Sequence, residues 1–170
     1  MIRVGGGVRK LLLILFLMST ALAYAEQPKL TYGYIEKVSI MPQGIQLPAK
    51  LDTGAKSASL YAINIKKVKQ KGKTYLQFTV PTEQGNVSFK EPLVGHVKIK
   101  MRSGEKHSGL RSGVFKRPVV KMTIKLGERV ETIRVNLADR TNFDYPLLLG
   151  RDAIVKFSGV IDPSRTYSIK

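Results

Sequence analysis

With 170 residues, the chain is long enough for one domain with a substantial hydrophobic core. It contains no cysteine, which excludes disulfides, thiolate metal sites and a cysteine nucleophile. A formal net charge of +17 favours a polyanionic neighbour, such as an anionic envelope surface or a nucleic acid.

The first 25 residues have the pattern of a signal peptide. Three basic residues precede an apolar run at 11–18, and Ala23 and Ala25 place small side chains where a signal peptidase reads them. This run is too short to span a bilayer stably, and an uncleaved anchor that extends to Ala25 is the alternative. We expect cleavage near Ala25-Glu26, a periplasmic or secreted protein, and one domain over residues 26–170.

From Thr31 onward, apolar and polar residues largely alternate, as they do in half-buried β-strands. Gly, Pro and Asn residues separate the apolar segments at roughly the 8–12-residue spacing of a barrel or sandwich. We therefore expect an all-β fold, with strands at 32–40, 45–51, 59–65, 74–80, 87–89, 94–101, 118–126 and 130–137. The lysine-rich segment 66–73 is expected to be a basic turn, either a solvated hairpin tip or a site for a polyanion.

A catalytic turn is suggested by the sequence Asp52-Thr53-Gly54-Ala55, which closes the expected strand at 45–51. A carboxylate followed by a small hydroxyl residue and a glycine suits a tight turn, in which nearby hydroxyl and N–H groups orient the acid. An aspartic peptidase needs a carboxylate presented in this way, because its nucleophile is a water activated between two carboxylates. The alternative is an ordinary turn in which an Asp side chain caps the backbone.

The segment 102–113 is rich in glycine and poor in apolar residues, and it lies between two expected strands. We expect an exposed hairpin tip there, with Gly104, Gly109 and Gly113 giving it freedom of movement. In an enzyme, such a hairpin can close over substrate as a flap. In a protein without catalytic activity, it is a long surface hairpin.

Near the C-terminus, an apolar strand at 145–149 runs into Gly150-Arg151-Asp152. A short helix is expected at 153–157, followed by a closing pair of strands at 160–163 and 167–169.

The Asp-Thr-Gly turn, followed later by an apolar strand and Gly-Arg-Asp, resembles the retropepsin-like aspartic peptidases. One bacterial family of this class, once described as ATP-dependent zinc proteases, is similar over further segments. These segments extend from about residue 32 to the end of the chain and comprise 52–60, 117–127, 136–140, 147–152 and 162–164.

The resemblance implies a closed β-barrel with a short C-terminal helix, and an endopeptidase activity on peptides. Asp52 would be the catalytic carboxylate, and Thr53, Gly54 and Ala55 would support its turn. The hairpin at 102–113 is the candidate flap from its place between the two motifs.

The resemblance also implies that Gly150, Arg151 and Asp152 brace the active-site floor, with Arg151 in charge pairs. Retroviral relatives carry an acid two residues after the glycine of the turn, whereas this chain has Lys56. The partner of Arg151 is therefore expected to be Asp152 or Asp139.

The chain holds one Asp-Thr-Gly and no second Asp-Thr-Gly or Asp-Ser-Gly. An aspartic dyad needs two carboxylates that share one proton at a separation of roughly 3 Å. A second copy would have to supply the other carboxylate, so we expect a homodimer in which Asp52 faces its symmetry mate across a two-fold axis.

No metal or cofactor is expected. His96 and His107 are the two histidines, there is no His-Glu-x-x-His, and no Gly-x-x-x-x-Gly-Lys-Ser/Thr is present. The bacterial family often has histidine where this chain has Tyr61, which weakens any metal role for that position.

The main alternative function is a catalytically silent module of the same fold that binds anionic envelope components through its positive charge. A nucleic-acid partner is not expected, because no known motif is present and the leader directs the chain out of the cytoplasm.

Overall fold

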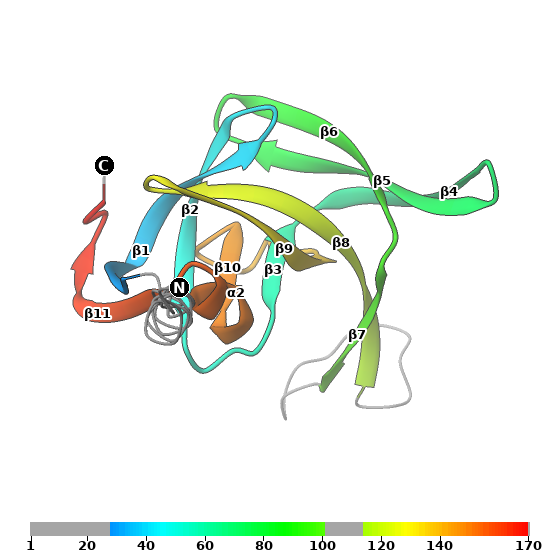
Figure 1. Ribbon diagram of the computed structural model, residues 1–170. Helices are drawn as coiled ribbons and strands as arrows, with labels where there is room; N and C mark the ends of the chain where they lie inside the picture. The colour runs from blue at the N-terminus through cyan, green and yellow to red at the C-terminus, as the bar shows by residue number, and fades with distance from the viewer. Residues whose placement is uncertain (1–27, 101–113, 170) are drawn as a thin grey trace, which may run out of the picture.

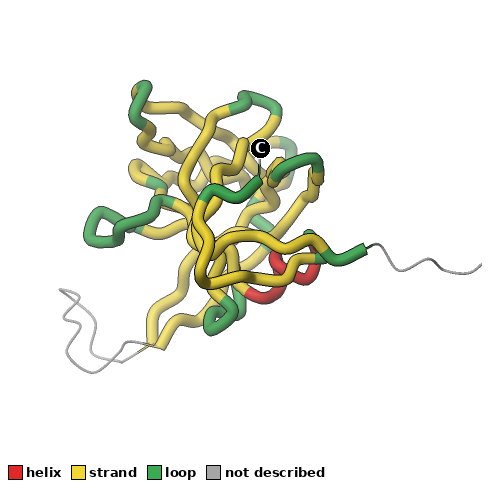
Figure 2. The backbone as a smooth tube through the Cα atoms, turned by 90° about the vertical axis from the view of Figure 1, so that its left-hand side faces the viewer, coloured by secondary structure: helices red, strands yellow, loops and turns green. Residues whose placement is uncertain are grey.

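The computed structural model describes residues 28–100 and 114–169. The expected leader at 1–25 and the candidate flap glycines Gly104, Gly109 and Gly113 lie outside the described residues. Strands dominate the described part, and Figure 2 shows them in yellow with the short helix in red. None of the helices in the described residues is long and apolar enough to cross a membrane.

Six strands form a closed barrel (Figure 1). Their order around the barrel is β1–β2–β10–β3–β9–β8, and pairing between β8 and β1 closes it. Two more strands extend this sheet: β11 pairs with β1, and β7 pairs with β8. The bounds are β1 (Leu30–Met41), β2 (Ile45–Asp52), β3 (Ala58–Tyr61), β7 (Gly95–Lys100), β8 (Val114–Leu126), β9 (Arg129–Ala138), β10 (Leu147–Gly150) and β11 (Gly159–Thr166).

The remaining strands make a separate three-stranded sheet in the order β4–β5–β6. In Figure 1 the turn between β4 and β5 projects to the right, beyond the barrel. The helix α2 follows β10 directly. The bounds are β4 (Ile63–Gln70), β5 (Lys73–Thr82), β6 (Gly85–Pro92) and α2 (Arg151–Lys156).

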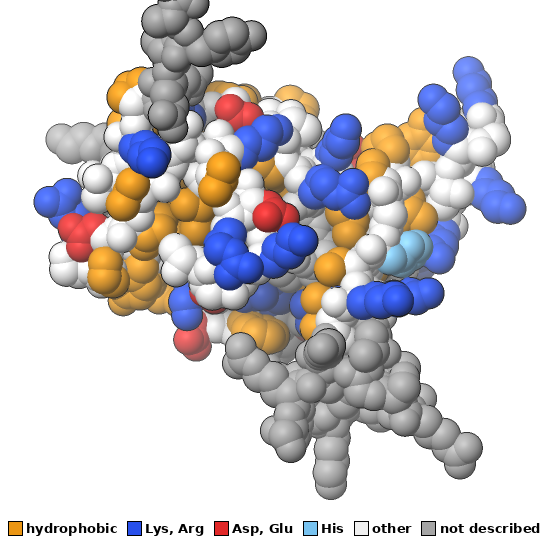
Figure 3. All heavy atoms as spheres, turned by 60° about the horizontal axis from the view of Figure 1, so that its bottom comes forward, with side chains coloured by type: hydrophobic (Ala, Val, Ile, Leu, Met, Phe, Trp, Pro, Cys, Tyr) orange, Lys and Arg blue, Asp and Glu red, His pale blue; other side chains and the backbone are white. Residues whose placement is uncertain are grey.

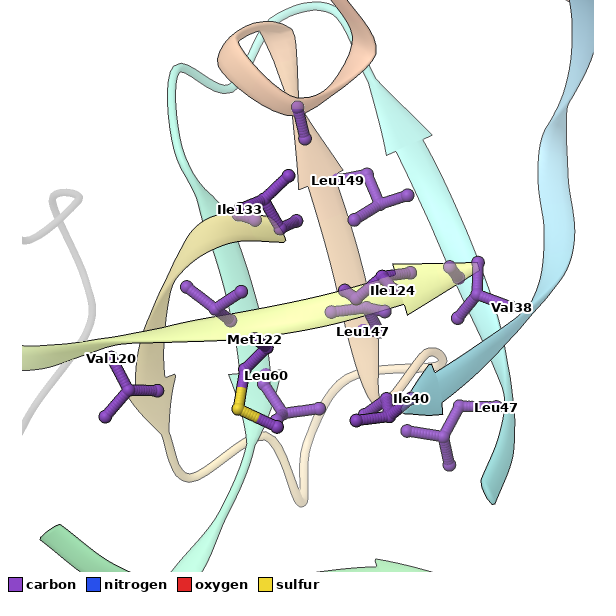
Figure 4. Close-up of a cluster of buried hydrophobic side chains, with 14 of the residues drawn as sticks. Val38, Ile40, Leu47, Leu60, Val120, Met122, Ile124, Ile133, Leu147 and Leu149 are labelled. Atoms are coloured by element: carbon purple, nitrogen blue, oxygen red, sulfur yellow. The ribbon is translucent and has the colours of Figure 1, made fainter. Parts of the chain in front are cut away.

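The hydrophobic core fills the inside of the barrel, because alternate residues of each strand point inward. Leu147 and Leu149 of β10 are fully buried there, between neighbours from β2 and β3. Figure 4 shows such side chains from several strands pointing toward one another. Burying a leucine of this kind stabilises the fold by about 1.5–3 kcal/mol.

The expected all-β class and most of the expected strands are confirmed. One strand was expected over 59–65, and this prediction is wrong. The segment divides at Ala62 into β3, which belongs to the barrel, and β4, which belongs to the second sheet. Ala62 is buried and its N–H donates to the carbonyl of Ala138 at 3.0 Å, which ends the barrel strand, while Asn64 takes a left-handed conformation (φ 55°) where β4 begins.

The basic segment 66–73 is mostly strand rather than turn. Only Lys71 and Gly72 form the turn, and both have positive φ (48° and 74°), as in the two-residue turns that match the twist of a hairpin. The neighbouring lysines therefore lie along β4 and β5.

The C-terminal helix begins at Arg151, two residues before its expected start. The closing strand pair is wrong: 159–166 form the single strand β11, which pairs in parallel with β1. Residues 167–169 follow it without strand structure.

A buried carboxylate holds this C-terminal segment in place. Glu36 is fully buried, and its Oε1 accepts hydrogen bonds from the N–H of Gly33 (2.7 Å) and from both the N–H (3.1 Å) and the hydroxyl (2.5 Å) of Ser168. Its Oε2 accepts from the N–H of Ile169 at 3.4 Å. These bonds replace the strand pairing that the sequence pattern predicts.

Replacing Glu36 with alanine should therefore lower the free energy of unfolding by about 3 kcal/mol, because the buried N–H of Gly33 and the partly buried donors of Ser168 and Ile169 lose their acceptor. The matched control is Glu131→Ala, which removes a partly exposed carboxylate paired with Lys156 at 3.5 Å and should cost less than about 1 kcal/mol. Urea denaturation measures both, and equal small losses would show that Glu36 does not anchor the segment.

Candidate active site

Asp52 is the last residue of β2, and it lies opposite Gly150 of the parallel strand β10. Its Oδ1 accepts hydrogen bonds from the N–H groups of Gly54 (2.9 Å) and Ala55 (3.3 Å). Its Oδ2 accepts no hydrogen bond from the described residues. The partly exposed carboxylate is thus held by one oxygen, and its other oxygen is free to bind a water or a second acid.

Gly54 allows the turn to close around this carboxylate. A Cβ at this position would lie 3.1 Å from Oδ1 of Asp52, which is closer than most such contacts. Thr53 is exposed and contributes its backbone carbonyl to the turn, as the next contacts show.

The first residues of helix α2 bind the turn through hydrogen bonds. The guanidinium of Arg151 donates to the carbonyl oxygens of Thr53 (3.0 Å) and Gly54 (3.4 Å). The backbone N–H groups of Arg151 and Asp152 donate to the next two carbonyls along the turn, at 2.8 and 3.1 Å. The first N–H groups of a helix have no partner inside the helix, so the turn and the helix satisfy each other's backbone groups.

A glycine is required at position 150, because the helix start and the turn lie very close together. A Cβ at Gly150 would lie 2.8 Å from the carbonyl carbon and oxygen of Lys56 and 2.8 Å from the carbonyl oxygen of Ser57. Since its φ is −82°, which any residue adopts, the constraint is purely one of space.

The structure differs from the expected charge pairing of Arg151. Arg151 is exposed, and within the described residues neither Asp152 nor Asp139 forms an ion pair with it. Asp139 instead accepts from the hydroxyl (2.6 Å) and the N–H (3.0 Å) of Thr141, which lower the pKa of Asp139 below its ordinary value. Arg151 contacts the turn through backbone carbonyls alone.

A row of side chains extends from Asp52 along the outer face of the barrel. Cross-strand partners share a face, so the registers place Leu148, Ser59, Asn136 and Val119 on the face that carries Asp52. The alternate residues of these strands face the core. Sequence reasoning assigned no role to this row.

Asn136 stands out in this row, because it is buried in an otherwise apolar strand end. Its Nδ2 donates to the carbonyl of Ala58 (2.6 Å) and lies 3.4 Å from the hydroxyl of Ser57, which ties β9 to the segment after the Asp-Thr-Gly turn. Its Oδ1 and the buried hydroxyl of Ser59 have no partner within the described residues. A polar residue between Val135 and Leu137 was the signal in the sequence.

Arg140 was also missed as a functional candidate. It is the second residue of the loop between β9 and β10, is buried, and donates from Nε to the carbonyl of Tyr145 at 3.0 Å. Its guanidinium stacks on the ring of Phe143 at 4.3 Å. Tyr61, the position where the bacterial family often has histidine, ties this loop to β3 through a 2.9 Å contact between its hydroxyl and that of Thr141.

The described residues contain no group of three or more His, Asp or Glu side chains that could hold a metal ion. His96 is exposed on β7, and His107 lies outside the described part of the chain. Figure 3 shows the face that carries the turn after β2, with Lys and Arg side chains spread over it and few acidic ones among them.

A six-stranded closed barrel, an Asp-Thr-Gly turn and a Gly-Arg helix start beneath it define a retropepsin-like protein. The family model described as "Retropepsin-like aspartic endopeptidase RimB" matches residues 31–170, and the chain belongs to this RimB-like family. The expected family and fold are thereby confirmed.

Curated relatives carry a different name. Two proteins called "Probable alpha-L-glutamate ligase", from Shewanella halifaxensis and Shewanella pealeana, are 26% and 27% identical over 127 residues. A third of that name, from Desulfotalea psychrophila, is 28% identical over 122 residues. The match covers 72% of this chain but 26% of each Shewanella protein, so the chain spans about a quarter of their length.

Among solved structures, a Legionella pneumophila protein of unknown function is 49% identical to this chain. The TM-score is 0.71, and the match covers 84% of this chain and 100% of that one.

The close contact between Gly150 and the carbonyl groups of Lys56 and Ser57 predicts that Gly150→Ala will lower the free energy of unfolding by about 1–3 kcal/mol. The added methyl group must push the turn away from the helix. Val155→Ala on the same helix is the control, since that side chain is 75% exposed and its loss should change stability by less than about 0.5 kcal/mol. Chemical denaturation compares the two. A Gly150→Ala protein as stable as the wild type would mean that the turn does not depend on this contact.

Proposed function

We propose that the protein is an aspartic endopeptidase that hydrolyses peptide bonds with a water activated between Asp52 and the Asp52 of a second copy. The observation that carries this proposal is the geometry of Asp52: a carboxylate fixed at a strand end by two backbone N–H groups, with one oxygen free. The sequence contains this motif once, so a two-fold homodimer would supply the second acid.

The proposed chemistry follows from bringing two like charges together. At a separation of about 3 Å the two carboxyl groups cannot both ionise, so the pair retains one proton. The ionised group takes a proton from the attacking water, while the protonated group donates to the carbonyl oxygen of the substrate. Proton transfer to the amine then allows the tetrahedral intermediate to break down.

Family membership supports a peptide substrate, and the names of the curated relatives suggest which peptides to test first. Those relatives are named as ligases of glutamate, and a segment similar to this chain makes up about a quarter of the two Shewanella proteins. Glutamyl peptides are therefore sensible first substrates for this chain, alongside an unbiased peptide mixture.

We also propose that the protein works in the periplasm. The basic and apolar pattern of residues 1–25 supports export, and the net charge that remains without its three basic residues, 17 − 3 = +14, suits a location near an anionic envelope surface.

The proposed mechanism predicts that Asp52→Asn will abolish peptide cleavage, because the amide can neither take a proton from water nor share one. The test uses the chain from Glu26 onward on a peptide mixture read by mass spectrometry, from about pH 4 to pH 8 and at several protein concentrations. Activity should rise faster than linearly with protein concentration and should survive a zinc chelator.

The matched control is Asp162→Asn. Asp162 is also held by local hydrogen bonds, since it accepts from the N–H (2.9 Å) and the hydroxyl (2.6 Å) of Ser164, but it lies on β11. This variant should retain activity. If wild type and Asp52→Asn behave alike at every pH, the protein is no aspartic peptidase, and the binding of anionic envelope components becomes the function to examine.

A further inference from the structure

The three-stranded sheet β4–β5–β6 presents a polar face that the proposed mechanism does not use. Its other face is buried, because Leu76, Phe78 and Phe89 belong to the same hydrophobic core as the barrel. Successive residues of a strand point to opposite faces, so the residues between these three face outward. In Figure 1 the hairpin β4–β5 extends beyond the barrel on the right, away from the turn that joins β2 to β3.

Cations gather on this sheet. Residues 63–92 contain six lysines, all of them exposed, and no arginine: Lys66, Lys67, Lys69, Lys71, Lys73 and Lys90. None of them belongs to either of the two ion pairs in the described part of the chain. The segment has two acids, Glu83 in the turn between β5 and β6, at the far end of β5, and Glu91 opposite the buried Leu76. The tip of the hairpin and the outer face therefore carry a concentrated positive charge.

The outer face also carries apolar side chains between its lysines. Counted from the tip, the cross-strand rows are Gln70 and Lys73, then Val68, Tyr75 and Pro92, then Lys66, Gln77 and Lys90. Ile65, beside Lys66, is 37% exposed. Figure 3 shows Lys and Arg side chains around this projecting end, on the right, with hydrophobic side chains beside them.

Lys90 connects these rows. Its Nζ donates to Oε1 of Gln70 at 2.6 Å and lies 5.5 Å from the centre of the Tyr75 ring. The stem of this lysine thus runs along the apolar row, while its charge stays at the surface. Tyrosine rings and long lysine side chains are the groups that place an apolar body in a membrane interface and a polar end in water.

A hollow of about 150 Å³ continues the outer face toward the base of the hairpin. It is lined by Asn64, Lys66, Gln77, Phe78, Thr79 and Ser88. Pockets that enclose a whole small molecule measure roughly 300–1,000 Å³, so this hollow fits only the head of a larger one. Its amide, hydroxyl and ammonium groups are donors that a phosphate oxygen accepts from.

A lipid surface fits this face better than a nucleic acid does. The row through Val68, Tyr75 and Pro92 gives no favourable contact to a phosphate backbone, whereas it can enter the boundary between headgroups and acyl chains. Lys90 lies over the ring of Tyr75, where a base would stack. The segment also lacks arginine, whose planar fork reads base edges.

We propose that the outer face of the β4–β5–β6 sheet, together with the lysines of its projecting hairpin, docks the protein onto bilayers that contain anionic phospholipids. The lysines attract the charged surface, the apolar row enters the interface, and the hollow receives a headgroup phosphate. The docking surface does not depend on the proposed peptidase activity, because it lies on a separate sheet from Asp52.

The experiment measures sedimentation of the chain with vesicles of phosphatidylcholine alone or with about a quarter of phosphatidylglycerol. It uses residues 26–170, which contain the whole described fold but not the apolar run at 11–18. Each lysine near an anionic surface strengthens binding roughly fivefold. The chain should therefore bind the mixed vesicles roughly a hundredfold or more tightly than the neutral ones.

Replacing four hairpin lysines with glutamine should leave less than roughly a tenth of this affinity. The four are Lys67, Lys69, Lys71 and Lys73. Arginine at the same four positions keeps the charge and should keep the binding. Lys71→Glu alone, at the exposed turn, should weaken binding roughly tenfold, and it serves if the fourfold glutamine variant does not fold.

The matched control removes the same charge from the barrel. Glutamine replaces Lys37, Lys50, Lys121 and Lys125 of β1, β2 and β8, and binding should fall less than roughly threefold. Equal losses in the two fourfold variants would show that net charge acts without a defined surface, and would overturn the proposal. Failure of the wild type to bind the mixed vesicles, or binding only to a DNA duplex offered at the same salt concentration, would overturn it as well.

Discussion

The site depends on the row of hydrogen bonds between the turn after β2 and the first residues of helix α2. Four consecutive carbonyls of the turn accept from Arg151 and Asp152, and the contact is so close that only glycine fits at position 150. The chain around Asp52 is thereby fixed by an element almost 100 residues away in sequence. The parallel pairing of β2 with β10 sets this contact, because it places Gly150 directly beside Asp52.

The same pairing fixes which side chains of β2 and β10 face the core and which face outward. Leu149 points into the core beside Leu51, while Asp52 and Leu148 lie on the outer face. The inward-facing side chains of β10 and of the end of β2 can therefore be apolar, and the outer face can carry polar groups such as Ser59 and Asn136. In the proposed mechanism the outer face of one copy meets that of another, which would convert a single carboxylate into a dyad and enclose the peptide between them.

Local patterns predicted much of this molecule. Alternation marked the barrel strands, and an acid followed by Thr-Gly at a strand end marked the turn. Three of the failures have one common cause, which is that distant partners decided the outcome. The break at Ala62 depends on the carbonyl of Ala138, the tail at 167–169 depends on buried Glu36, and Arg151 binds carbonyls rather than a carboxylate. No local pattern reveals that Arg140 is buried, because this follows from the path of the loop that precedes β10.

The most direct test of the central claim mixes two proteins. Wild-type chain is held at a fixed concentration at which it cleaves peptides, and Asp52→Asn chain is added in increasing excess, with time for subunits to exchange. If each catalytic site takes one Asp52 from each of two copies, mixed dimers are inactive and cleavage should fall toward zero. Cleavage that stays constant as the variant is added would show that one copy contains a complete site, and it would contradict the shared dyad.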